Sequence, residues 1–258
     1  AFTVRGQLAL NGASAREKKG KPAPGQRRVC RLIINMVPAN SYQRTMRDDI
    51  GTLSASPSWV AVPLPEGHVL LWSSDDQASA FYCYELPEAW QPYMTLAQAV
   101  PNELIGVSGP GKTHIALRVI PMGWINAVTV FQHCHRRLGF GLKPRAAGFP
   151  PEAEWRKDRP LPFKSKQLEQ AWVQYYIDDW DHGEIVPEGL VNELVGCMSA
   201  VQGEQRAAYA RSGISVSKDK AKHRELILER MGAAVDGVTG RVGVTTEKLH
   251  LLLAFTMW

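Results

Sequence analysis

Hydrophobic and polar positions along this chain predict short strands mixed with helices, in no regular alternation. Compact apolar runs that are rich in β-branched and aromatic residues, and that end at proline, glycine or acidic residues, are typical of strands. The strand-like runs are residues 27–37, 58–64, 68–72, 114–120 and 172–177. The chain has no internal repeat. Strands and helices without βαβ order favour the α+β class.

Helical periodicity predicts the remaining elements. Apolar and aromatic side chains recur on one face of a helix over residues 125–138, which Gly139 is expected to end. The longest helical stretch covers residues 187–213, from a proline to a glycine. Further expected elements are helices at 41–53, 166–172 and 247–258, and a two-stranded hairpin at 228–245 that turns across Gly237 to Gly240.

Residues 106–113, GVSGPGKT, match the spacing of a phosphate-binding loop. Such a loop must follow a buried strand and begin a helix whose backbone amides hold the phosphates. Residues 101–105 are too few and too polar for a buried strand, and residues 114–120 alternate as a strand does. We therefore interpret Gly109-Pro110-Gly111 as a turn between two strands. A nucleotide hydrolase that uses Lys112 is the weaker alternative.

Length and composition indicate a globular protein. A chain of 258 residues with 45% hydrophobic residues can form one large domain or two small ones around a real core. No apolar run approaches the roughly 20 residues of a membrane helix, and the first residues lack the plan of a signal peptide. We therefore expect no membrane association and a cytoplasmic or nuclear location. The four cysteines show no CxxC spacing, so reduced and mostly buried thiols are expected.

Positive charge is concentrated in two stretches. The net charge is +5, and residues 1–31 carry eight of the basic residues against a lone Glu17. We expect residues 1–26 to form a basic, poorly ordered arm that binds a polyanion such as nucleic acid. Residues 141–170 form a second basic, proline-rich insertion in which Trp155 and Phe163 are interleaved. This insertion either follows a phosphate backbone and stacks on bases or is a solvated loop.

Two acidic sites each end a strand-like run. Asp75 and Asp76 follow one run, and Asp178, Asp179 and Asp181 follow another. If the two strands are neighbours, at about 4.8 Å, the carboxylates converge. Converging carboxylates repel one another and suit a hard divalent cation, magnesium or alternatively manganese. Two such ions support in-line phosphoryl transfer, whereas each Asp pair taken alone is also ordinary turn chemistry.

Tyr176-Ile177-Asp178-Asp179 matches the YxDD signature of reverse transcriptases, and the order of the surrounding segments matches as well. Residues 120–132, IPMGWINAVTVFQ, are similar to the LPFGLxNAPxxFQ element of that family. The resemblance spans residues 27–244 and is to retrotransposon enzymes of the LTR or tyrosine-recombinase type. It implies a right-hand polymerase, in which an antiparallel palm sheet backed by helices is joined by fingers, with residues 245–258 beginning a truncated thumb.

The resemblance also implies roles for individual residues. Asp76, Asp178 and Asp179 would hold the metal ions, and Lys220 would act near the leaving pyrophosphate. The substrate-binding residues implied are Arg31, Phe81, Gly123, Gln132 and Tyr176. Each has a plainer alternative: a surface ion pair for Arg31, a core aromatic for Phe81, a helix-start glycine for Gly123, a packed glutamine for Gln132, strand packing for Tyr176 and a solvated basic face for Lys220.

The activity implied by the resemblance is template-directed DNA synthesis from deoxynucleoside triphosphates on an RNA or DNA template-primer. The sequence departs from the family pattern at Asp75, Met122 and Val128, none of which is an expected metal ligand. No RNase H domain is expected, so the chain is interpreted as a piece of a retroelement polyprotein or its relic. The alternative function is a decayed or domesticated copy that binds nucleic acid without polymerising. No oligomeric state is predicted.

Overall fold

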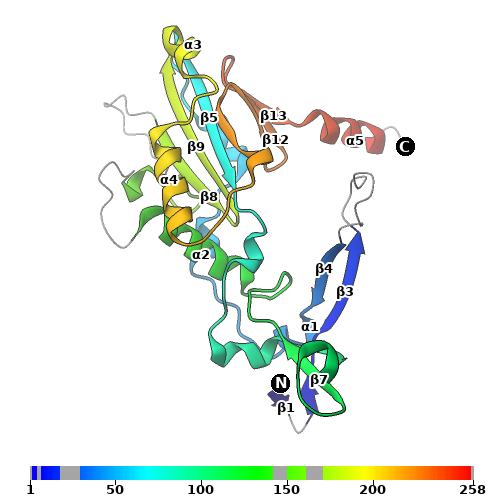
Figure 1. Cartoon of the computed structure of the whole chain (residues 1–258). Helices are drawn as coiled ribbons and strands as arrows, with labels where there is room; N and C mark the ends of the chain where they lie inside the picture. The colour runs from blue at the N-terminus through cyan, green and yellow to red at the C-terminus, as the bar shows by residue number, and fades with distance from the viewer. Residues whose placement is uncertain (1, 5–6, 18–29, 142–149, 161–170, 257–258) are drawn as a thin grey trace, which may run out of the picture. The chain divides into compact units, whose positions relative to one another are not determined.

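The computed structural model describes residues 2–4, 7–17, 30–141, 150–160 and 171–256 (Figure 1). The chain divides into two compact units. Unit 1 comprises residues 1–46 and 79–129, and unit 2 comprises residues 47–78 and 130–258. Helices and antiparallel sheets are both present, as the α+β prediction requires. Among the described residues, no helix combines the length and the apolar character needed to cross a membrane.

Unit 2 is built on a four-stranded antiparallel sheet in the order β10-β5-β9-β8 (Figure 1). Its strands are β5 (His68–Asp76), β8 (Ala171–Tyr176), β9 (Asp179–Pro187) and β10 (Lys222–Glu225). β5 and β9 pair along their whole lengths, from His68 opposite Pro187 to Asp76 opposite Asp179. The strands predicted at 68–72 and 172–177 are confirmed.

One face of this sheet packs against helices α2 (Ala127–Phe140) and α4 (Ala200–Arg211). Val173, Tyr175 and Trp180 form the buried cluster there, with Phe140 from α2 and Val201 from α4 against it. The predicted helix at 125–138 is confirmed, but Gly139 does not end it. A side chain at Gly139 would collide with the Tyr175 ring, so this glycine lets α2 approach β8 closely.

The opposite face packs against a second antiparallel sheet of β11 (Ile227–Arg230), β12 (Ala233–Asp236) and β13 (Arg241–Val244). Four tryptophans dominate this core: Trp59, Trp72, Trp155 and Trp172. The Trp72 and Trp172 rings meet edge to face, with centroids 5.4 Å apart. Because each tryptophan removes roughly 150–250 Å² from water, this cluster fixes the two sheets against each other.

Short elements complete unit 2. They are η1 (Asp49–Thr52), η2 (Ser56–Ala61), η6 (Pro151–Ala153), η7 (Glu188–Leu190), α3 (Val191–Leu194), η8 (Lys218–Lys220) and α5 (Thr246–Thr256). The predicted hairpin at 228–245 is present as β12 and β13, with β11 added beside it. The predicted terminal helix is present as α5.

The described part of unit 1 contains three two-stranded antiparallel sheets. They are β1 (Phe2–Val4) with β2 (Gln7–Ala9), β3 (Gly12–Glu17) with β4 (Cys30–Asn35), and β6 (Thr95–Pro101) with β7 (Lys112–Ala116). Its helical turns are α1 (Val37–Asn40), η3 (Ala80–Tyr82), η4 (Glu88–Met94) and η5 (Asn102–Ile105). The buried Asn11 joins these pieces, because its amide donates to the carbonyls of Tyr93 and Thr95 and accepts from the N–H of Ala39.

Several sequence expectations were wrong. Residues 58–64 form the turn η2 rather than a strand, since Pro57 sits in its first turn, where no N–H is needed. Residues 41–53 form turns and the short η1 rather than one helix. The expected helix over 187–213 is interrupted between α3 and α4, where Gly196 has a φ of 78° and the Ser199 hydroxyl accepts from the N–H of Gln202 to start α4.

Two other expectations also need correction. The arm expected over residues 1–26 contains strands β1, β2 and β3 in its described part, and residues 18–26 lie outside the described residues. The thiols were expected to be mostly buried, but those of Cys30, Cys83 and Cys197 are exposed and that of Cys134 is half-buried. The helix expected at 166–172 falls mostly on residues 161–170, outside the described chain.

Candidate nucleotidyl-transfer site

The acidic end of the large sheet in unit 2 joins two distant parts of the sequence. β8 and β9 are connected by the two-residue turn Ile177-Asp178, which places Asp179 at the start of β9. Asp76, the last residue of β5, pairs with Asp179 across the ladder. The backbone N–H of Gln77 donates to the carbonyl of Asp178, with the nitrogen and oxygen 3.1 Å apart. Asp76, Asp178 and Asp179 therefore lie at one end of neighbouring strands.

Two basic side chains contact this acidic end. The Nζ atom of Lys220 lies 3.1 and 3.0 Å from the two carboxylate oxygens of Asp76. Arg230, on β11, reaches Asp179 through Nη2 at 3.2 Å and Asp181 through Nε at 3.1 Å. The Asp76 side chain is 9% exposed and that of Lys220 is 59% exposed. Lys220 therefore approaches the buried carboxylate from the solvent side.

Burial and mutual repulsion oppose simultaneous ionisation of the carboxyl groups at this end. Burial raises the pKa of Asp179 to about 7, against an opposing effect of Arg230, while Asp181, Asp178 and a hydrogen bond with Asp76 raise it further. Burial also raises the pKa of Asp178, with Asp76 adding to the effect. Near neutral pH Asp179 is thus partly protonated. Added positive charge at this end would favour the ionised forms.

The donor chemistry of these residues fits a divalent ion, because oxygen ligands of this kind are what magnesium and manganese prefer. In the part of the chain that the structure describes, however, no three acidic, histidine or cysteine side chains are arranged as a ready metal site. Lys220 and Arg230 supply the positive charge there instead. The metal ligands Asp76, Asp178 and Asp179 stay a prediction.

The turn that carries Asp178 is held by side chains from α2. Ile177 has a φ of 56°, which is unusual for a β-branched residue. Gln132 accepts from the N–H of Ile177 at 2.9 Å and donates to the carbonyl of Tyr175 at 2.9 Å. The Nδ1 atom of His135 lies 2.7 Å from the carbonyl of Ile177. These contacts fix both sides of the turn and so support its strained backbone.

His135 works as a neutral group. Burial lowers its pKa to about 4, so the ring is uncharged at neutral pH. Since its Nδ1 faces the Ile177 carbonyl, Nδ1 carries the proton and Nε2 accepts from the hydroxyl of Tyr209, on α4. Helical spacing in the sequence predicts only that His135 lies on the buried face of a helix. It carries no signal that the ring holds the Ile177-Asp178 turn.

Two further aspartates, Asp75 and Asp181, are buried next to the site. Asp75 is completely buried and its carboxylate receives both Nε and Nη2 of Arg206, from α4, at 3.0 and 2.7 Å. Asp181 is also completely buried, and accepts from Gln174 at 2.8 Å as well as from Arg230. Asp75 is a residue at which the sequence departs from the reverse-transcriptase motifs that it resembles. Arg206 explains how an acid is accommodated there.

Gln132 was predicted to line a substrate pocket, and the structure places it elsewhere. Its side chain is completely buried, and besides the turn it contacts the hydroxyl of Thr52. It therefore supports the hairpin and is not exposed to a substrate. Tyr176 is half-buried in β8, opposite Asp179.

The other predicted substrate-binding residues belong to unit 1. Arg31 is in β4, opposite Arg16, and its side chain lies outside the described part. Phe81 is half-buried in η3 and lines a small hollow with Leu32 and other apolar residues. Gly123 has a φ of 93°, and a Cβ there would come within 3.2 Å of the carbonyl oxygen of Ile34. A glycine is therefore needed at this position for backbone reasons alone.

The loop at 106–113 is an exposed turn between β6 and β7, as the sequence predicted. Asn102 closes it, donating to the carbonyl of Gly109 at 3.2 Å and accepting from the hydroxyl of Thr113 at 2.8 Å. A strand follows Gly111 where a phosphate-binding loop has a helix. No helix N-terminus is present at this described loop to hold phosphate groups.

The described part of the basic insertion, residues 150–160, is structural. Trp155 is 1% exposed in the tryptophan core, and its indole N–H donates to Ser58 at 2.9 Å. Arg156 pairs with Asp158, and Arg159 donates to the carbonyl of Glu154. Because Trp155 is enclosed in this way, stacking of bases on it is excluded. Phe163 lies outside the described residues.

Comparison with known proteins gives the fold a name. No protein-family model matches the chain, and no curated protein matches it. Among solved structures, the foamy viral protease-reverse transcriptase in complex with an RNA/DNA hybrid is similar with a TM-score of 0.52 and 12% identity, over 92% of this chain and 24% of that one. The dRH form of that protein, in complex with double-stranded DNA, has a TM-score of 0.51 and 13% identity, over 90% of this chain and 32% of that one.

The chain thus spans about a third or less of the length of these structures. Both structures are bound to nucleic acid, and both are similar to nearly the whole of the present chain. At this identity the likeness concerns the fold alone. The chain has a reverse-transcriptase-like fold.

Proposed function

We propose that this chain is an RNA-directed DNA polymerase that extends a primer with deoxynucleoside triphosphates on an RNA or DNA template. The observation that carries the proposal is the pairing of Asp76 with Asp179, next to the Asp178 turn, inside a reverse-transcriptase-like fold. Fold likeness alone supports no chemistry. The acidic end would supply the groups that the reaction needs.

Each residue at this end would have a separate task. Asp76, Asp178 and Asp179 would hold Mg²⁺ or Mn²⁺. When bound, a pair of such ions would activate the primer hydroxyl and stabilise the leaving oxygen. Arg230 orients Asp179 and Asp181 through its guanidinium, and Lys220, exposed beside Asp76, would neutralise or protonate the leaving pyrophosphate.

Further residues would bind the substrates. Arg31 would present a planar guanidinium to the triphosphate, and Phe81 would lie beside the sugar and select deoxynucleotides. Gly123 and Tyr176 would contact the template and the nucleotide. Gln132 would act through the YxDD turn, which it holds, so we propose it as a positioning residue.

The partner of the protein would be a template-primer duplex. The net charge of +5 favours a polyanion, and the similar structures are complexes with double-stranded DNA and with an RNA/DNA hybrid. The parent protein would be a retrotransposon polyprotein of the LTR or tyrosine-recombinase type, on the resemblance of residues 120–132 and 176–179.

Primer extension tests this function. The wild-type chain and Asp178→Asn are incubated with an RNA template, a DNA primer, deoxynucleoside triphosphates and magnesium. We expect extension by the wild type and a loss of roughly 100-fold or more in the variant, because the carboxylate is replaced by a neutral amide of the same shape. Extension that is equal in both proteins would exclude the acidic end as the catalytic site.

One observation favours a second function, binding of nucleic acid without polymerisation. Lys220 and Arg230 already neutralise the acidic end, and the described side chains form no ready metal site. A relic with this arrangement would bind template-primer and incorporate nothing. Equal binding by the wild type and Asp178→Asn, with no incorporation by either at any magnesium or manganese concentration, would favour it over the polymerase.

A further inference from the structure

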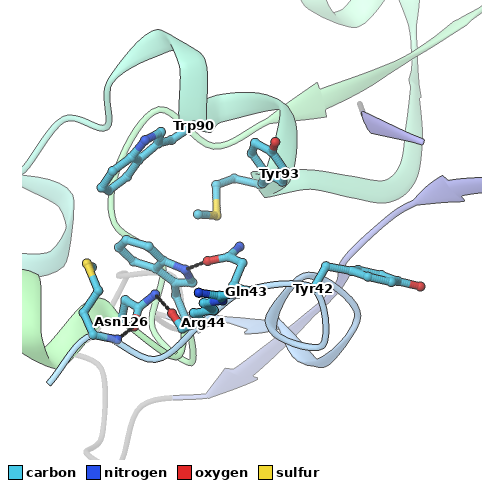
Figure 2. A pocket seen from close by; sticks show the side chains of 9 residues that line it. Tyr42, Gln43, Arg44, Trp90, Tyr93 and Asn126 are labelled. Carbon is cyan, nitrogen blue, oxygen red and sulfur yellow. Dashed lines mark hydrogen bonds between the residues drawn. The ribbon is translucent and has the colours of Figure 1, made fainter. Parts of the chain in front are cut away.

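Unit 1 contains a cavity of about 300 Å³ that the proposed chemistry does not use. It is lined by Tyr42, Gln43, Arg44, Met46, Trp90, Tyr93, Met94, Trp124 and Asn126. This size lies at the lower end of the range for small-ligand pockets. Figure 2 shows Trp90 and Tyr93, from η4, on one side and Gln43, Arg44 and Asn126 on the other. The two sides come from segments that are far apart in the sequence.

The pocket is held in shape by hydrogen bonds. Asn126 accepts from the N–H of Met46 at 2.8 Å and donates to the carbonyl of Arg44 at 3.0 Å (Figure 2). The indole N–H of Trp124 donates to the side-chain oxygen of Gln43. On the other side, Asn11 donates to the carbonyl of Tyr93. Both walls are therefore fixed before any ligand arrives.

Trp90 differs from the other tryptophans that the structure describes. Its exposed fraction is 37%, whereas each of the other six is at most 5% exposed. It contacts Trp124 edge to face, with centroids 5.6 Å apart, and this leaves part of its ring toward solvent. Tyr93 is 39% exposed beside it. Open aromatic faces of this kind stack on flat heterocycles.

Polar and charged groups at the pocket determine which kind of heterocyclic ligand it accepts. Arg44 is exposed, and within the described chain its guanidinium has no ion pair or hydrogen bond, whereas Arg118 in the same unit pairs with Glu85. None of the lining residues is acidic. The amide nitrogen of Gln43 points away from Trp124, so it stays available as a donor (Figure 2).

We infer that this pocket binds one unpaired nucleobase of a nucleic-acid strand, with the base against Trp90 and Tyr93 and its phosphate on Arg44. The aromatic side chains supply stacking that every base accepts. The guanidinium supplies a planar, doubly donating contact for phosphate oxygens. The occupant would thus be chosen for having a base and a phosphate, with little preference for sequence. The inference rests on the proposed function only for the source of the strand.

Binding is measured in the Asp178→Asn background, so that no DNA is synthesised and a failure of the polymerase proposal leaves the result readable. The probes are a single-stranded DNA hexamer of mixed sequence, a hexamer made wholly of abasic sites, and a deoxynucleoside monophosphate. Tryptophan fluorescence and anisotropy of a labelled hexamer report binding. We expect the hexamer to bind at least about 10-fold more tightly than the abasic hexamer.

Three variants and a control complete the test. Trp90→Ala should weaken hexamer binding by about 10-fold, Trp90→Phe should restore most of it, and Arg44→Ala should weaken it and reduce its salt dependence by about one phosphate contact. Leu104→Ala, at a residue that is 73% exposed in the same unit and does not line the pocket, should bind as the parent does. If Trp90→Ala unfolds, Arg44→Ala and Trp90→Phe still show whether the pocket contributes to hexamer binding.

The outcomes distinguish a nucleic-acid strand from other ligands of the pocket. Equal affinity for the base-containing and abasic hexamers, or unchanged affinity in both Trp90→Ala and Arg44→Ala, would overturn the inference. A monophosphate that binds as tightly as the hexamer, and is lost in Trp90→Ala, would overturn the assignment to a strand and leave a free nucleotide as the ligand. Binding that follows Trp90 in a chain that never extends a primer would still support the pocket.

Discussion

The two most recognisable short motifs of this sequence, GVSGPGKT at 106–113 and YIDD at 176–179, stand in different surroundings. The first is an exposed hairpin turn closed mainly by Asn102. The second lies at the end of a sheet, where Gln132 and His135 hold its backbone and Arg230 and Lys220 meet its carboxylates or those beside it. Spacing made the first motif a candidate, whereas the second was one because acidic residues end two strand-like runs and because residues 176–179 resemble a family signature.

The difference shows what a motif needs in order to do chemistry. A phosphate-binding loop depends on a helix N-terminus, whereas the strand β7 follows the turn here. The acidic turn depends on buried polar partners that fix it against strain and charge repulsion. These partners lie on α2, α4 and β11, well away from the motif in the sequence.

The largest expected effect contrasts the two motifs directly. Asp76→Asn should lower nucleotide incorporation by about 1000-fold, because the carboxylate that we propose as a metal ligand would contribute several kcal/mol to phosphoryl transfer. Lys112→Ala, in the exposed turn, should leave incorporation within about twofold. Single-turnover primer extension measures both. A loss in Lys112→Ala with none in Asp76→Asn would reverse the assignment of the two motifs.

The side chains that support the two turns should contribute differently to the free energy of unfolding. Gln132→Ala leaves the half-buried N–H of Ile177 and the buried carbonyl of Tyr175 without their side-chain partner, so we expect a loss of about 3 kcal/mol in the free energy of unfolding. Asn102→Ala, its matched control in the exposed turn, should cost under about 1 kcal/mol. Urea unfolding followed by circular dichroism gives both values. Equal costs would mean that Gln132 is not a special support.

A smaller effect tests the charge at the acidic end. Because the pKa of Asp179 is raised to about 7 in the folded chain, the unfolded chain ionises this group at lower pH, and stability is lost as the pH rises from about 4 to about 7. Asp179→Asn removes this titration. The variant should match the wild type near pH 4 and exceed it by about 2 kcal/mol near pH 8, since partial exposure reduces the full linkage energy.

Unfolding midpoints of both proteins across this pH range, without divalent ions, provide the measurement. A variant that is less stable than the wild type at pH 8 would mean that Arg230 fully compensates the charge of Asp179.

The smallest effect concerns Gly106 in the exposed turn. Its φ is 68°, and a Cβ added there would meet no atom within 4 Å. Gly106→Ala should therefore cost about 1 kcal/mol through backbone strain alone. Nucleotide incorporation should not change. A drop in triphosphate binding, measured by calorimetry, would show that this turn contacts phosphate after all.

Local patterns predicted some of the elements at the acidic end, but not β9, which begins at Asp179. β5, β8 and α2 are strongly patterned, so their positions follow from the sequence. The region 187–213 was harder, because Gly196 and Ser199 interrupt a pattern that otherwise continues as a helix. The strand expected at 58–64 was wrong for a related reason, since the prolines in and beside this segment favour a short turn over a strand.

The supporting residues of the site could not be read from the sequence. Arg206 and Arg230 are two of many basic residues in a basic chain, and their partners Asp75 and Asp181 are far away along it. His135 and Gln132 look like ordinary positions of an amphipathic helix. Their functions become visible only when α2 lies against the hairpin, which depends on the tertiary fold. Composition also suggested that Trp155 could stack on bases, whereas it is a core residue.

Binding of Mn²⁺ tests the central claim most directly, that the three aspartates at the end of β5 and β9 form a divalent-ion site. Free Mn²⁺ is followed by its paramagnetic resonance signal while the chain, with template-primer, is titrated. We predict binding by the wild type and by Lys112→Ala, and its loss in both Asp76→Asn and Asp178→Asn. The same binding in all four proteins, or none in the wild type, would contradict the account.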